Sequence, residues 1–111
     1  MKHRNLESLT EEPVSHNPEI RKRVMFRKGD LPHLTNFAQA RFAPGQTATP
    51  HSHQDMTEVF FVSAGEGEIR VDGVAHRVAA GDCLAIEAGE NHEVINTGPS
   101  ELVLTYFGIA P

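Results

Sequence analysis

The sequence has a single cysteine, Cys83, and no long apolar run. One cysteine cannot form a disulfide within the chain, which fits a reducing compartment. The densest apolar run, at residues 59–62, is far shorter than the roughly 20 residues that cross a bilayer. Residues 1–13 contain no apolar stretch suited to a signal peptide. We therefore expect a cytoplasmic protein that has no membrane partner.

Basic side chains are scarce beyond residue 41. Residues 42–111 hold two Lys/Arg against ten Asp/Glu, whereas residues 1–41 carry a net charge of +3. An acidic domain repels phosphate backbones, so nucleic acid is not an expected partner. The run Arg21-Lys22-Arg23 has no helix-turn-helix pattern around it, and we interpret it as a solvated face of the N-terminal segment.

The chain also lacks any window with the 3.6-residue periodicity of an amphipathic helix. Short apolar segments recur instead between Gly and Pro turn signals. The expected strands are residues 24–27, 34–43, 59–62, 69–71, 74–78, 83–86, 93–96 and 102–107. This pattern predicts an all-β fold, an antiparallel sandwich or barrel.

A chain of 111 residues can build one apolar core but not two. Residues 1–24 contain two prolines and only scattered apolar side chains. We interpret them as an N-terminal arm that packs on the rest of the protein, and residues 25–111 as a single domain.

Asp72-Gly73 is the strongest hairpin signal, because both positions tolerate positive φ. A two-residue turn there pairs Val71 with Val74 and Ile69 with His76. These side chains then share one face of the hairpin with Val78, and the opposite face carries charge.

Four side chains form a candidate metal site: His51, His53, Glu58 and His92. On a strand, His51 and His53 would project from the same face with Cα atoms ~6.7 Å apart. Three imidazoles and one carboxylate suit Zn, Fe, Mn, Ni, Cu or Co rather than Ca or Mg. A His-x-His pair is also common on protein surfaces, so the residues around these four side chains decide whether they form a metal site. Cys83 is interpreted as a small strand residue rather than a ligand or nucleophile.

Two motifs surround these residues. Gly45, His51, His53, Glu58 and Gly65 fit G-x5-H-x-H-x3,4-E-x6-G, and Gly81, Gly89, His92 and Asn96 fit G-x5-P-x-G-x2-H-x3-N, with Glu87 in place of the proline. Through these residues the chain resembles small single-domain microbial members of the cupin superfamily, over about residues 37–108. The resemblance implies an antiparallel jelly-roll β-barrel of six to eight strands. It also implies one divalent transition metal held inside by His51, His53, Glu58 and His92.

The resemblance leaves several functions open. The first is a metal-dependent enzyme that acts on a small oxygenated molecule, as a dioxygenase, isomerase or decarboxylase. The second is a non-catalytic module that binds a metal or a small molecule. The third is a barrel that keeps the ligand set without the ion. Cupin regulators carry an attached DNA-binding domain, and none is recognisable here.

The strand after Glu58 is apolar on both faces. Phe60 and Val62 share the face of Glu58 and are expected to line the pocket. Val59 and Phe61 then point outward, where the N-terminal arm or a second subunit would cover them. Small cupins are commonly dimers, so we expect a homodimer.

The remaining candidate side chains are expected to be structural. Arg41 could anchor a carboxylate if it faced inward, although exposed placement is the preferred interpretation. Packing or rim positions are expected for Met56, Tyr106 and His76, and surface or packing positions for His3, His16 and His33.

Overall fold

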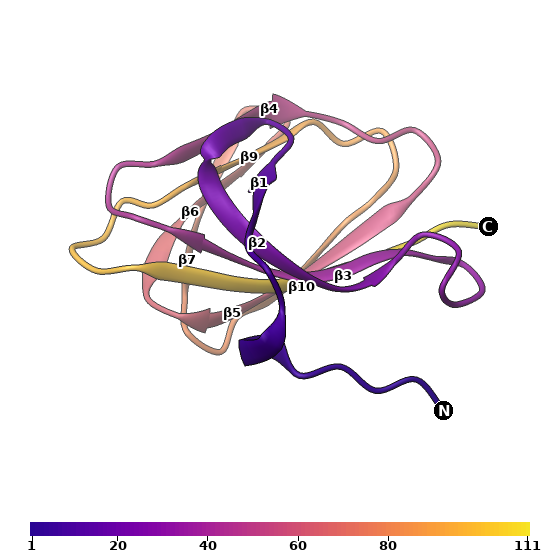
Figure 1. Ribbon diagram of the computed structural model, residues 1–111. Helices are drawn as coiled ribbons and strands as arrows, with labels where there is room; N and C mark the ends of the chain where they lie inside the picture. The colour runs from indigo at the N-terminus through magenta and orange to yellow at the C-terminus, as the bar shows by residue number, and fades with distance from the viewer.

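The computed structural model describes residues 1–111 and arranges ten strands in two facing antiparallel sheets (Figure 1). The larger sheet has the order β1-β2-β3-β10-β5-β8, and the smaller one β4-β9-β6-β7. The strands are β1 (Glu12–Val14), β2 (Asn17–Arg27), β3 (Leu34–Phe42), β4 (Thr47–His51), β5 (Thr57–Ala64), β6 (Glu66–Val71), β7 (Val74–Ala79), β8 (Cys83–Ile86), β9 (His92–Ile95) and β10 (Leu102–Ile109). The predicted all-β jelly roll is confirmed, with ten strands where six to eight were expected. The structure contains no helix that could span a membrane.

The N-terminal segment differs from the predicted arm, because it contributes two strands to the larger sheet. The strand expected to begin at Val24 begins at Asn17, and β2 pairs with both β1 and β3. Ile20 and Val24 are buried on its inner side. Only residues 1–11 precede the sheet, with a short 3-10 helix, η1 (Leu6–Ser8). Arg4 lies 4.9 Å above the ring of Phe26 on the outer side of β2.

The core lies between the two sheets and follows the two-residue period of the strands. Ala38, Ala40 and Phe42 of β3 are buried, whereas Gln39 and Arg41 face outward. The core cluster also takes in buried aliphatic and aromatic side chains from other strands: Ile20, Val24, Phe60, Val62, Ile69, Val78, Ile86, Val94, Leu102, Leu104 and Tyr106. The small side chains of β3 leave room between the sheets for a cavity.

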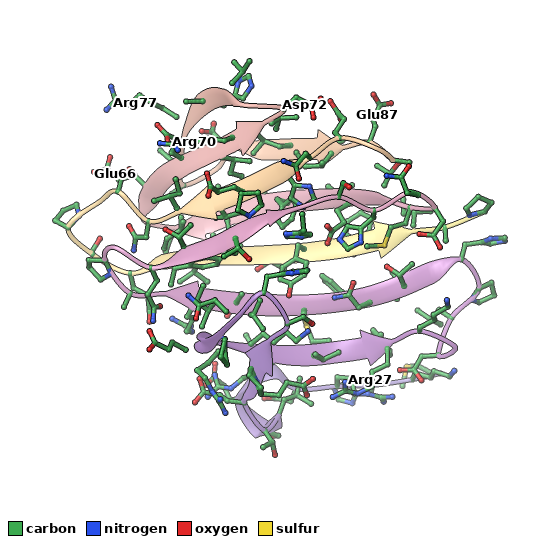
Figure 2. The ribbon with its side chains drawn as sticks, turned by 90° about the horizontal axis from the view of Figure 1, so that it is seen from above. Arg27, Glu66, Arg70, Asp72, Arg77 and Glu87 are labelled. Atoms are coloured by element: carbon green, nitrogen blue, oxygen red, sulfur yellow. The ribbon has the colours of Figure 1, made fainter.

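The predicted hairpin at Asp72-Gly73 is confirmed in register, since Val71 pairs with Val74 and Ile69 with His76. Asp72 and Gly73 both have positive φ, at 48° and 81°, as a two-residue hairpin turn requires. Val74, however, is 59% exposed, because β7 is the edge strand of the smaller sheet. Figure 2 shows Arg70, Asp72 and Arg77 along this hairpin, on the opposite side of the molecule from Arg27.

The turns of the two motifs have the backbone conformation that their glycines predict. All four motif glycines have positive φ, and a Cβ on Gly65 would also lie 2.3 Å from the Glu101 carbonyl oxygen. Glu87, at the usual proline position, points away from the barrel (Figure 2). The Glu87 N–H donates to the Glu90 carboxylate at 2.7 Å, and the Glu90 N–H donates back to the Glu87 carbonyl at 3.1 Å. A proline would have no N–H for the first of these bonds.

Candidate metal centre

The four predicted ligands come together between the sheets. His51, the last residue of β4, pairs directly with His92, the first residue of β9, in the smaller sheet. Glu58 projects from β5 of the larger sheet, and His53 lies in the connection between β4 and β5. One potential ligand atom from each of the four lies within 4.8 Å of all the others.

His53 is positioned differently from the prediction, because β4 ends at His51 and the two histidines do not share a strand. A backbone bond fixes the connection instead: the Gly89 N–H donates to the His53 carbonyl at 2.7 Å. This bond joins the two motifs directly. It brings the loop that carries His53 against the turn that precedes His92.

Two of the imidazoles are oriented by backbone carbonyl groups. Nδ1 of His51 lies 2.9 Å from the Thr49 carbonyl oxygen, and Nδ1 of His92 lies 3.3 Å from that of Glu90. An Nδ1 proton donated to a carbonyl leaves Nε2 with a free lone pair in the neutral ring. Both rings therefore present a metal-ligating nitrogen toward Glu58.

Polar atoms at the centre of this group lack partners. Glu58 is 6% exposed and His92 only 1%. Nε2 of His53 and of His92 lie 3.1 and 3.2 Å from Oε1 of Glu58. Nevertheless Glu58 Oε1 and His92 Nε2 have no hydrogen-bond partner. A carboxylate oxygen and an imidazole nitrogen buried this close together without a hydrogen bond are unfavourable unless a proton or a metal ion lies between them. The residues present therefore fit a divalent transition metal.

The charges of the group are strongly coupled. Burial raises the pKa of Glu58, but contact with His92 and the charges of His53 and His51 outweigh it, so that the net shift is downward. Burial lowers the pKa of His92. Contact with the Glu58 carboxylate, followed by the backbone carbonyl and the charge of Glu90, outweighs burial, so the net shift is upward. Burial dominates at His51, where the pKa falls. Glu58 is thus held ionised, as a metal ligand must be.

Beside the cluster lies a cavity of about 160 Å³. Three of the four ligands reach its wall, and the lining residues are Val14, Ser15, His16, Lys22, Asn36, Ala40, Phe42, Ala48, His51, His53, Met56, Glu58, Phe60, Val94, Leu104 and Tyr106. The volume corresponds to about five water molecules. A metal held by four protein ligands can keep open positions, and a small molecule in this cavity could occupy them.

Two ionisable residues of the cavity wall were not predicted to lie there. His16, in the turn between β1 and β2, stacks on His51 with ring centroids 3.8 Å apart. Its pKa is lowered, first by burial and then by the charge of His53. Lys22, interpreted as part of a solvated face, instead lines the cavity. The alternation of Ile20, Lys22 and Val24 indicates an inward position for Lys22, whereas no pattern in the sequence indicates the position of His16.

The predictions for the cavity wall are confirmed in part. Phe60 lines the cavity, whereas Val62 is buried in the core outside its wall. Tyr106, expected in packing or at the rim, stacks on Phe60 at 5.4 Å and lines the cavity. Burial, and then the charge of Glu58, raises the pKa of the Tyr106 hydroxyl. Met56 also lies in the wall.

The remaining candidate side chains lie outside the candidate metal site, as the preferred interpretation of the sequence predicts. Arg41 faces outward and donates to Glu101 at 2.6 Å, which removes it from the cavity. Cys83 is exposed on β8, opposite Phe61 of β5. His76 is exposed on β7.

Comparison with known proteins agrees with the motifs. A family model described as "Cupin domain" matches residues 38–107. The oxalate-binding protein of Thermotoga maritima is 30% identical over 83 residues, which are 75% of this chain and 64% of that protein. Dimethylsulfoniopropionate lyase DddW of Ruegeria pomeroyi is 34% identical over 67 residues, which are 60% of this chain and 43% of the lyase. The chain therefore spans less than two thirds of the length of either relative.

Solved structures share the fold. The crystal structure of a Thermotoga maritima protein described as a predicted oxalate decarboxylase superimposes with a TM-score of 0.89 at 23% identity, over 96% of this chain and 97% of that one. KdgF from a Halomonas species gives a TM-score of 0.77 at 22% identity, over 95% and 90% of the two chains. At these identities the likeness is one of fold.

Proposed function

The chain belongs to the cupin domain family, and we propose that it is a metal-dependent enzyme that acts on a small oxygenated molecule. The observation that carries the proposal is the pair of buried, unpartnered atoms, Glu58 Oε1 and His92 Nε2, beside the cavity. A closed structural metal site would have no adjoining space for a ligand. The reaction types that we propose are those of a dioxygenase, an isomerase or a decarboxylase.

We propose that His51, His53, Glu58 and His92 hold one divalent ion per chain, drawn from Mn, Fe, Zn, Ni, Cu and Co. When bound, such an ion would supply Lewis-acid polarisation of a ligand oxygen. The protein would fix His51 and His92 through the Thr49 and Glu90 carbonyls. Phe60 and Tyr106 would exclude bulk water from one wall of the cavity.

Elemental analysis of tag-free protein tests the ligand set. We expect about one equivalent of transition metal in the wild type and a large loss in His53→Ala, because a ligand is removed. His76→Ala is the matched control, since it removes an exposed histidine of β7 and should keep the metal. Wild-type protein with less than about a tenth of an equivalent after supplementation would contradict the proposal.

Turnover decides whether the site is catalytic. Metal-loaded protein should convert at least one member of a panel of small hydroxy, keto and dicarboxylic acids, tested with and without O2. His53→Ala should abolish that conversion. The measurement is product formation, monitored by chromatography, together with O2 consumption.

The second candidate is a non-catalytic module that binds a metal and a small molecule. The specific observation in its favour is the name of the Thermotoga maritima relative, an oxalate-binding protein. Calorimetric binding of a chelating acid by metal-loaded protein, without conversion of any compound of the panel, would favour this candidate over the enzyme.

We also propose that the protein is a homodimer. The support is the outer face of the larger sheet, where Phe61 is 45% exposed and Val59 is only half-buried. Contacts of the N-terminal segment lie over β2, at Phe26 and Arg23, and leave Phe61 uncovered. The cytoplasmic location expected from the sequence stays a prediction.

A further inference from the structure

Lys22 is a half-buried charged side chain. It lies on the face of β2 that carries the buried residues Ile20 and Val24, and its cross-strand partner on β3 is the buried Ala40. The side chain lines the same cavity as His51, His53 and Glu58. Lys22 therefore lies in the wall of the space beside the candidate metal ligands.

The ammonium group of Lys22 has no hydrogen bond or ion pair to any protein group. The nearest candidate is Glu12, which is directly opposite Lys22 on β1. Both carboxylate oxygens of Glu12 are instead taken by Arg27, at 3.1 and 2.5 Å. Because Lys22 lines the cavity without a protein partner, its ammonium group is available to a ligand there.

The charges of the cavity indicate the kind of ligand. Glu58 contributes −1, a divalent ion would add +2, and Lys22 adds +1. Glu12 does not offset the charge of Lys22, because it is paired with Arg27. The loaded cavity would thus carry a net charge of about +2, which an anion balances far better than a neutral molecule. The cavity volume of about 160 Å³ suits a small anion.

We propose that Lys22 is a specificity-determining residue that pairs with a carboxylate of a small dicarboxylate ligand, whose other oxygen atoms face His51, His53, Glu58 and His92. The inference rests on the proposed function, since it concerns the ligand of the same site. Arg41, the alternative carboxylate anchor, cannot fill this role, because it lies outside the cavity and is paired with Glu101.

Oxalate and oxamate test this role, because they have the same shape and differ by one negative charge. We would measure their affinities by calorimetry for metal-loaded wild type, Lys22→Met and Lys22→Arg. Wild type should prefer oxalate. Lys22→Met should reduce that preference by about 10- to 100-fold, the usual effect of losing a charge-assisted bond, and Lys22→Arg should restore part of it.

Arg21→Met is the matched control. It removes the same charge from the exposed face of β2, and it should leave the ratio of the two affinities within about twofold of wild type. Thermal midpoints should show that Lys22→Met is as stable as wild type or more so, because an unpartnered ammonium is replaced by an apolar chain of similar length.

The metal content of each variant separates this inference from the proposed function. Lys22→Met should keep as much metal as wild type, since Lys22 is not a ligand. An unchanged oxalate-to-oxamate ratio in fully loaded Lys22→Met would overturn the inference and leave the metal site intact. Failure of wild type to bind either acid would overturn it as well. Absence of metal from wild type would instead refute the proposed function.

Discussion

At the scale of single residues, two polar side chains of the second motif are buried for different reasons. Asn96 is 1% exposed, and all its polar atoms are used. Its amide donates to the Phe42 and Ser100 carbonyls and accepts from the Gly98 N–H, each at 2.9 Å. His92 is equally buried, but its Nε2 has no partner. The satisfied amide of Asn96 fits a structural role, whereas the unpartnered nitrogen of His92, next to Glu58, fits the proposed role as a metal ligand.

Replacement of Asn96 by alanine should therefore destabilise the fold without touching the metal ligands. Three backbone groups lose their partner, including the buried Phe42 carbonyl. We expect a loss of about 3 kcal/mol in the free energy of unfolding. Urea denaturation followed by circular dichroism would measure it.

Asn91→Ala is the control, because Asn91 is exposed and its side chain makes no hydrogen bond. That variant should stay within about 0.5 kcal/mol of wild type. Equal stabilities for Asn96→Ala and Asn91→Ala would show that the bonds of Asn96 contribute little.

The cluster of candidate ligands was predictable at this scale, because a metal site restricts both the residue types and their spacing. His51, His53, Glu58 and His92 could be named without coordinates, although the strand assumed for His53 was wrong. His16 could not be named, since nothing local to a turn predicts that it will stack on a residue of another strand. Its place depends on how β1 and β2 join the larger sheet.

At the scale of elements, the β1–β2 hairpin is where sequence and structure differ most. Its polar composition and prolines favoured an arm, yet β2 is the longest strand of the protein. Partial burial explains the difference: one face needs apolar residues only at Ile20 and Val24, and the outer face stays charged. A half-buried strand with a lysine between its two core residues gives a weak apolar signal.

The ion pair between Glu12 and Arg27 helps to hold this hairpin closed. The Arg27 guanidinium donates to the carboxylate and lowers the pKa of Glu12 below its ordinary value. The unfolded chain therefore binds a proton more readily than the folded one. The stability from the pair is fully present above the unfolded pKa of about 4.3. It is lost as the pH falls through the lower folded value.

Glu12→Gln should accordingly have a lower thermal midpoint than wild type at neutral pH, and the difference should shrink toward zero in acid. Scanning calorimetry across the acid range is the measurement. Glu11→Gln is the control, because its carboxylate makes no ion pair. A Glu12→Gln deficit that stays constant on acidification would mean that packing, and not charge, is responsible.

At the scale of the whole molecule, the proposed ion would join the two sheets. Glu58 belongs to the larger sheet, and His51 and His92 belong to the smaller one. The unfolded chain cannot hold the four ligands together, so metal binding should stabilise the folded state by mass action.

Removal of the metal should therefore lower the melting temperature. A free ion at a thousand times its Kd stabilises by about 4 kcal/mol, which corresponds to a shift of the order of 10 °C for a chain of this size. Differential scanning fluorimetry with and without a chelator would detect it. His53→Ala should melt at the same temperature in both conditions. A wild type that is insensitive to the chelator after confirmed loading would contradict this role.

The outer face of the larger sheet bears on assembly. Phe61 is 45% exposed on β5 beside the half-buried Val59 and Phe107, which form an apolar patch that the N-terminal segment does not cover. If two chains associate through it, light scattering should give twice the 12.2 kDa of one chain. Phe61→Glu should shift the protein toward the monomer, because a charge would be buried at the interface.

Val74→Glu is the matched substitution on the smaller sheet, where Val74 is 59% exposed on the edge strand β7. It should leave the mass unchanged if the dimer forms through β5. Dissociation by Val74→Glu alone would move the interface to the smaller sheet. A wild-type mass of one chain at micromolar concentration would refute the dimer altogether, and the apolar face around Phe61 would then need another partner.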